Sequence, residues 1–112
     1  MIRTIGKDAV ITVATDASNS AGVKTDAMLL TGILFPATMT GANVTFDFSF
    51  DGSTWVDVVE TDGTEVSYVV TAGDVVRVDP SGWAFASSGY LRITSDATEA
   101  ADRTISLIFR TS

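Results

Sequence analysis

The segment from Val44 to Phe50 constrains the fold more than any other part of the chain. Apolar residues stand at every second position in it, namely Val44, Phe46, Phe48 and Phe50. Because successive side chains leave a β-strand on opposite faces, this pattern predicts a strand with one buried face. Burying one phenylalanine stabilises a fold by roughly 1.5 to 3 kcal/mol, so a one-residue slip that exposed all three rings is heavily penalised. The three phenylalanines are therefore expected to fix the register of this strand.

Two Asp-Gly pairs follow this strand and predict tight turns. Asp51-Gly52 and Asp62-Gly63 supply residues that tolerate positive φ, as hairpin turns require. The first turn predicts a partner strand that starts at Trp55. The second turn joins that strand to another one over Glu65 to Val70.

Short runs of β-branched and aromatic residues cover the rest of the chain, and no window keeps a helical period. Eight strands in about 100 residues suggest an all-β, single-domain antiparallel β-sandwich, in particular an eight-stranded jelly roll, with an up-and-down barrel as the alternative. In the last strand, Ile105, Leu107 and Phe109 are expected to face inward. Residues 79–89 are expected to form a loop or a short helical turn. The predicted strands cover residues 9–15, 27–36, 44–50, 55–60, 65–70, 75–78, 90–94 and 103–110, within a domain over residues 8–112 that follows an arm over residues 1–7.

Composition excludes several kinds of chemistry. The chain has no cysteine and no histidine, so it lacks the usual ligands for zinc and the usual general base. Only Lys7 or Lys24 could activate a serine or threonine, and neither lies in a Ser-x-x-Lys arrangement. A net charge of -7 repels nucleic acid and anionic membranes. We therefore expect a protein that is not an enzyme, needs no cofactor and binds neither nucleic acid nor a membrane.

Aspartates are the remaining candidates for a metal site, because calcium takes several oxygen ligands. Asp47 and Asp57 are expected to face each other across the first hairpin. Other aspartates fall in predicted turns, where their side chains accept hydrogen bonds from nearby backbone groups. The Asp-x-Asp-x-Asp-Gly spacing of a calcium loop is missing, so no metal is predicted. The turn aspartates are Asp51, Asp62, Asp74, Asp79, Asp96 and Asp102.

Three large aromatic residues are candidates for a binding or interface surface: Trp55, Trp83 and Tyr90. Together they could form a platform for a sugar ring. Ser49 to Trp55 also resembles the Ser-x-Asp-Gly-x-x-Trp hairpin of discoidin-like sugar-binding jelly rolls, although that hairpin is usually structural. We favour burial in the core or in an interface, which is the commoner fate of large aromatics in so small a domain.

Several short motifs along the chain carry a wider resemblance. They are Gly-Ile-x-x-Pro-Ala at residues 32–37, Thr-Gly-Ala-Asn at residues 40–43, the Ser-x-Asp-Gly hairpin at residues 49–52, and Ala-Gly followed by an apolar run and Asp-Pro at residues 79–80. On these motifs, most of residues 30–110 resembles a family of small all-β proteins encoded among the virion genes of tailed bacteriophages. The motifs consist of turn and strand residues, so the resemblance implies a scaffold more strongly than an activity.

The resemblance implies a virion structural role, as a decoration or cement protein that binds the outer surface of the capsid shell and stabilises it. The implied partners are the major capsid protein and further copies of the chain, as a homotrimer. Such a protein would be made in the host cytoplasm and located on the capsid exterior. Residues 1–7 are the candidate arm for gripping the shell, with a frayed terminus as the competing interpretation. The candidate contact residues in this arm are Met1, Ile2, Arg3 and Lys7.

Two alternatives to decoration remain open at this stage. One is a carbohydrate-binding adhesive module of a head or tail fibre, which would bind host glycans. The other is a minor head-tail or tail component, which would be present in only a few copies per particle.

Overall fold

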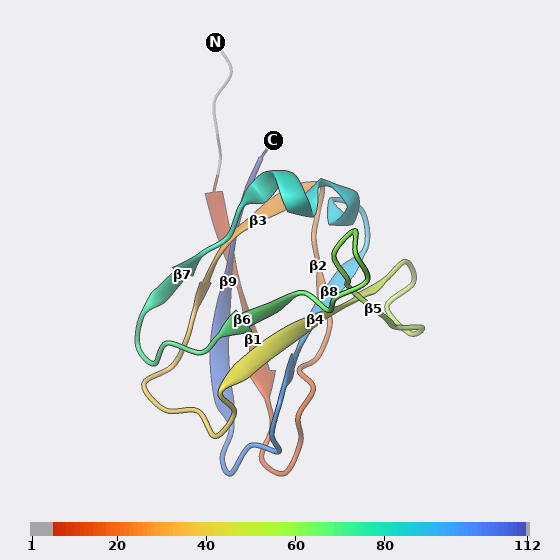
Figure 1. The fold of residues 1–112 in the computed structure, drawn as a ribbon. Coiled ribbons are helices and arrows are strands. Elements are labelled where there is room, and N and C mark those ends of the chain that lie inside the picture. The colour runs from red at the N-terminus through yellow and green to blue at the C-terminus, as the bar shows by residue number, and fades with distance from the viewer. Residues whose placement is uncertain (1–5, 112) are drawn as a thin grey trace.

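Residues 6–111 are described by the computed structural model, and they form a β-sandwich of two antiparallel sheets (Figure 1). The elements are β1 (Gly6–Val13), β2 (Val23–Lys24), β3 (Met28–Leu34), β4 (Asn43–Ser49), β5 (Val56–Asp57), β6 (Ser67–Val69), β7 (Val75–Arg77), the 3-10 helix η1 (Pro80–Ala86), β8 (Tyr90–Ser95) and β9 (Arg103–Thr111). One sheet has the strand order β1-β9-β3-β7, and the other has the order β2-β8-β4-β5, with β6 also paired to β4. Figure 1 shows η1 across one end of the sandwich and the loop between β8 and β9 at the opposite end.

The two sheets pack their apolar faces together, and the predicted alternating strand lies at the centre of this core. In β4, the side chains of Val44, Phe46 and Phe48 are 0%, 0% and 5% exposed. The alternate apolar residues of β9 are also buried, as their spacing predicts. These residues are Ile105, Leu107 and Phe109. The predicted all-β sandwich is therefore confirmed, and period-2 alternation identifies its core correctly. No helix within residues 6–111 is long and apolar enough to cross a membrane.

β5 and β6 are two parts of one edge strand that a small hairpin interrupts. Both pair with the same edge of β4: Asp57 pairs with Asp47, and Ser67 pairs with Thr45. The two β4 residues are two positions apart, whereas their partners are ten apart, so the edge carries eight extra residues. These extra residues form the protruding hairpin over residues 59–66. With β5 and β6 counted as one strand, each of the two sheets has four strands.

Removal of this hairpin is expected to leave the sandwich intact. Deleting residues 59–66 joins β5 to β6 in the register that β4 already sets for both. We expect the deletion variant to keep its β-sheet circular dichroism and a cooperative urea transition, with a loss of about 1 to 3 kcal/mol because the apolar cover of Val58 is removed. Deleting seven residues instead of eight is the matched control, because it shifts the register by one and turns inward side chains outward. Equal stability of the two deletions would contradict this description of the edge.

Several local features differ from the prediction. β1 begins at Gly6, and Lys7 in this strand pairs with Phe109 of β9. The predicted arm over residues 1–7 therefore extends too far, because residues 6 and 7 belong to the sandwich. β2 adds a ninth strand that the sequence does not predict, because two residues are too few to give a periodic pattern. Of the two alternatives for the segment after Asp79, the structure has the helical one, η1.

Phe50 departs from the alternation, and the prediction that it shares the buried face is wrong. β4 ends at Ser49, whose Oγ accepts a hydrogen bond from the Gly52 amide at 2.8 Å and donates one to Asp51 Oδ1 at 2.9 Å. Gly52 has a φ of 82°, which glycine adopts without steric cost. This turn bends the chain directly after Ser49 and leaves the Phe50 side chain 86% exposed. The Ser-x-Asp-Gly motif is therefore a structural turn in this protein.

Candidate functional site

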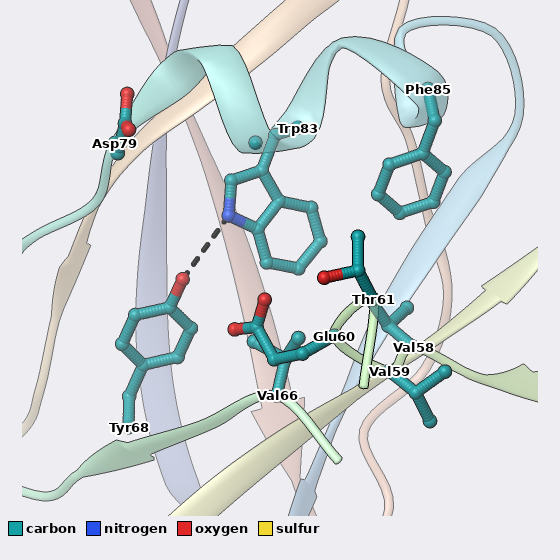
Figure 2. Close-up of a pocket in the computed structure, with 10 residues that line it drawn as sticks. Val58, Val59, Glu60, Thr61, Val66, Tyr68, Asp79, Trp83 and Phe85 are labelled. Carbon is teal, nitrogen blue, oxygen red and sulfur yellow. Dashed lines mark hydrogen bonds between the residues drawn. The ribbon is translucent and has the colours of Figure 1, made fainter. Parts of the chain in front are cut away.

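Trp83, one of the three candidate aromatics, is a core residue of η1. Its side chain is 4% exposed, and its ring lies 4.8 Å from the ring of Phe46 in an edge-on arrangement. The Trp83 Nε1–H donates a hydrogen bond to the Tyr68 hydroxyl at 3.2 Å (Figure 2). Burial raises the pKa of Tyr68 above its usual value, and the Trp83 hydrogen bond opposes that shift. Both residues line an open hollow of about 360 Å³ between η1 and the protruding hairpin.

A row of aromatic rings runs from Trp83 to the surface. The Phe85 ring is stacked near Trp83 at a centroid distance of 5.8 Å, and it lies 5.6 Å from the ring of Phe48. Phe48 in turn meets the ring of Phe50 edge to face at 4.9 Å. Such pairs contribute about 0.5 to 1.5 kcal/mol beyond the burial of their area. The buried Phe48 ring therefore contacts both Phe50 and Phe85.

Phe50, Phe85, Val56 and Val59 form an exposed apolar surface, which we call the Phe50–Phe85 surface. Their exposed fractions are 86%, 54%, 57% and 51%. Two open hollows along it share Phe48, Phe50 and Val56 in their walls, and a third shares Val59 and Phe85 with one of them. The hollows are therefore neighbours. Sequence reasoning missed this surface, because a period-2 pattern places Phe50 inside and says nothing about the exposure of Phe85 in an irregular segment.

Trp55 and Tyr90, the other two candidate aromatics, lie on the outer face of the second sheet. Tyr90 and Arg92 are the outward-facing alternates of β8. The Arg92 guanidinium lies 4.7 Å from the centroid of the Trp55 ring, a cation–π contact that occupies one face of the indole. A Cβ added to Gly22 would come within 2.7 Å of the same indole, so the ring also packs closely against backbone. Because Trp83 lies in the core, the three aromatics do not form one platform.

Asp47 and Asp57 do face each other across the hairpin, as predicted. Asp47 is 6% exposed and forms an ion pair with Arg92, with 2.8 Å between Nε and Oδ2. Thr94 Oγ1 donates to the same carboxylate oxygen at 3.1 Å. The arginine offsets the repulsion between the two carboxylates, which gives this pair a structural explanation. Within residues 6–111, no group of three or more potential ligands is placed to hold a metal ion.

The candidate arm lies almost wholly outside the described residues. Nothing is described for Met1, Ile2 and Arg3, so their contact with a shell stays a prediction. Lys7 is placed in β1, as noted above.

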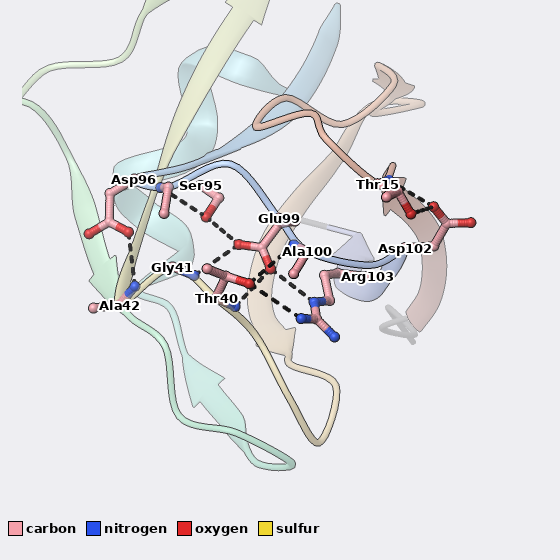
Figure 3. Close-up of polar contacts among 11 residues, drawn as sticks. Thr15, Thr40, Gly41, Ala42, Ser95, Asp96, Glu99, Ala100, Asp102 and Arg103 are labelled. Atoms are coloured by element: carbon pink, nitrogen blue, oxygen red, sulfur yellow. Dashed lines mark hydrogen bonds and ion pairs between the residues drawn. The ribbon is translucent and has the colours of Figure 1, made fainter.

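At the opposite end of the sandwich, Glu99 joins three loops (Figure 3). Its side chain is fully buried and accepts hydrogen bonds from the backbone amides of Thr40 and Gly41 at 2.8 and 2.9 Å. The Ser95 hydroxyl donates to Oε2 at 2.7 Å, and Arg103 Nε lies 2.9 Å from Oε1 as an ion pair. The backbone of Glu99 adds bonds to the loop after β1. The sequence gives no signal for this role, since Glu99 stands in a polar loop like any solvated glutamate.

The Thr-Gly-Ala-Asn motif supplies the backbone donors for the Glu99 carboxylate. After Thr40 and Gly41 donate to Glu99, the next amide, of Ala42, donates to Asp96 Oδ1 at 2.8 Å. A Cβ on Gly41 would collide with the Ser95 hydroxyl, so only glycine fits there. This motif is part of the bacteriophage resemblance, and its backbone amides connect two loops by hydrogen bonds to Glu99 and Asp96.

Several turn aspartates accept backbone hydrogen bonds, as predicted, and two of them bridge loops that are distant in sequence. Asp51 accepts from the amides of Thr54 and Ser53, and these bonds together with the Ser49 hydroxyl lower the pKa of Asp51 to about 2. Asp96 and Asp102 differ from the expected nearby contacts. Their partners are Ala42 and Thr15 respectively.

Acid is expected to destabilise the fold through Glu99. Burial raises the pKa of this carboxyl, but hydrogen bonds from Thr40, Ser95, Gly41 and Arg103 outweigh burial and lower it from the usual 4.5 to about 2. A lowered folded-state pKa means that the stabilisation is complete above about pH 4.5 and is lost as the pH falls towards 2. The urea midpoint should therefore fall between pH 5 and pH 2.5. In the variant Glu99→Gln, the midpoint should be lower at pH 7 and should change less with acid. If acid lowers the urea midpoint of the wild type and of Glu99→Gln equally, Glu99 is not the source of the acid sensitivity.

The fold defines this chain as an all-β sandwich protein with an exposed apolar surface. No protein-family model and no curated protein matches its sequence. Among solved structures, it is similar to the SPBc2 prophage-derived protein YomS, with a TM-score of 0.59 and 14% sequence identity. The match covers 99% of this chain and 99% of the other. At this identity, the comparison establishes a shared fold over the full length of both chains.

Proposed function

We propose that this chain is a structural protein of a bacteriophage virion, with no enzymatic activity. The observation that carries the proposal is the fold shared with a prophage-derived protein over 99% of both chains. The short motifs within residues 30–110 that resemble those of virion proteins point in the same direction. A fold alone does not define a function. The proposal therefore also rests on the exposed apolar surface, which suits adhesion to another protein.

Within that role, the proposal is a decoration or cement protein on the outer surface of the capsid. Its partner would be the major capsid protein. Phe50 and Phe85, at 86% and 54% exposed, support an adhesive role because large apolar groups gain free energy when a partner covers them. A homotrimer at a local threefold position of the shell would bind through several weak contacts at once, so the trimer would bind more tightly than a single chain. The protein would be made in the host cytoplasm and carried on the capsid exterior.

Purified particles test this proposal. We expect the protein in many copies over the whole shell in an electron-microscopy map, and we expect particles that lack it to release their genome at a lower temperature. A few copies at a unique vertex would identify a head-tail or tail component instead. Absence from purified particles would contradict any virion role.

A further inference from the structure

The Phe50–Phe85 surface is apolar and contiguous. Scattered exposed apolar side chains are ordinary on a protein surface, but a group that surrounds neighbouring hollows marks an interaction site. The surface is assembled from three segments: the turn after β4, the edge formed by β5 and the hairpin, and the helix η1. Phe48 contacts both Phe50 and Phe85, so the two exposed rings share one buried neighbour.

All charged residues that line these hollows are acidic. They are Asp51, Asp57, Glu60 and Asp79. Within residues 6–111, no lysine or arginine lines any of the three hollows. Glu60 lies beside Val66 and below Trp83 in the wall of one of these hollows (Figure 2). The surface therefore combines an apolar centre with an anionic rim.

We propose that the Phe50–Phe85 surface docks a protein segment that presents an apolar side chain flanked by lysine or arginine. The apolar side chain occupies the hollow between Phe50, Val59 and Phe85, and the flanking cations meet the acidic rim. Complementary charge of this kind raises the association rate and rejects partners of the wrong sign. The inference rests on the proposed function only for the identity of the partner, a subunit of the shell.

Charge also argues against two other occupants. A symmetric pair of copies that used this surface on both sides would bring the two acidic rims together, because such an interface repeats the same patch on each subunit. An anionic membrane would be repelled by the same rim. A partner with basic residues around an apolar side chain meets neither obstacle.

Site-specific photo-crosslinking tests where the partner sits. A photo-activated residue is placed at position 50, at position 85 and, as a control, at position 10 on the other sheet, where Val10 is 59% exposed. The experiment is run both in cells that produce the whole phage and in purified particles. We expect positions 50 and 85, but not position 10, to crosslink to one other protein at a segment with an apolar residue next to lysine or arginine. Crosslinks to a second copy of this chain, equal labelling from all three positions, or no crosslink at all would overturn the inference.

Binding to shells purified without this protein measures the contribution of each group. We expect Phe50→Ser and Phe85→Ser to weaken binding about tenfold or more, while Val10→Ser changes it less than about twofold. The variant Glu60→Gln should weaken binding about twofold and flatten its dependence on salt concentration. Each variant is checked by its melting curve, and the exposed position of Phe50 predicts an unchanged one. Wild-type affinity in both phenylalanine variants would overturn the inference.

The two proposals fail in different ways. If the wild-type protein is absent from particles and does not bind shells, yet positions 50 and 85 crosslink to a basic-flanked segment in cells, the virion role is contradicted and the docking surface is supported. If the wild-type protein binds shells but both phenylalanine variants bind equally well, the virion role is supported and this surface is not the contact.

Discussion

Glu99→Ala is expected to destabilise the sandwich by about 3 to 5 kcal/mol, because it leaves a buried arginine contact and three further donors without their acceptor. A domain of this size has a total stability of about 5 to 15 kcal/mol, so the variant should approach the unfolded state. Urea titration at pH 7 followed by circular dichroism measures the loss. The large effect is expected although Glu99 lies in a loop, because its carboxylate is the acceptor for two backbone amides of another loop and for the side chains of Ser95 and Arg103.

Glu65→Ala is the matched control, since Glu65 is an exposed glutamate of the protruding hairpin. Its loss should stay within about 0.5 kcal/mol. If Glu99→Ala and Glu65→Ala unfold at the same urea concentration, the buried junction contributes nothing to stability and this account of the loops is wrong.

Trp83→Ala is expected to cost about 3 to 5 kcal/mol, the usual range for removing a large buried aromatic. The substitution opens a cavity beside Phe46 and leaves the Tyr68 hydroxyl without its donor. Differential scanning calorimetry should show a melting point lower by more than about 10 °C. Loss of glycan binding in this variant could therefore not be read as loss of a sugar platform, because the fold itself would be weakened.

Phe85→Ala provides the comparison within the same helix. Phe85 is 54% exposed, so its truncation should cost only about 1 kcal/mol. If the two variants of η1 melt at the same temperature, Trp83 does not anchor the helix to the core.

The sequence predicted the fold class and much of the core, because both depend on local periodicity. Alternation in residues 44–50 and 103–110 placed Phe46, Phe48 and the apolar residues of β9 inside, and the Asp-Gly pairs marked the turns. The prediction failed where that periodicity ends. Phe50 is one residue beyond β4, and the turn that starts at Ser49 carries it into solvent.

The candidate sites were much less predictable than the fold. Trp55 gave no sign of its contact with Arg92. Trp83 was expected in the core or in an interface only because large aromatics are commonly buried, and no local pattern distinguished it from Trp55 and Tyr90. Phe85 lies in a segment whose conformation the sequence left open between loop and helix. Its contact with Phe48 depends on how η1 crosses the end of the sandwich.

The amino-acid sequence by itself determined that this chain forms short antiparallel strands with one apolar face, because side-chain alternation and turn residues act over a few neighbouring positions. Only the tertiary structure decided that Glu99 is a buried junction, since its donors Thr40 and Gly41 lie 59 and 58 residues away. It also decided that Phe50 and Phe85 meet around one buried ring and face outward. Contacts of this kind depend on which loops the sandwich brings together, and no local pattern of residues specifies that.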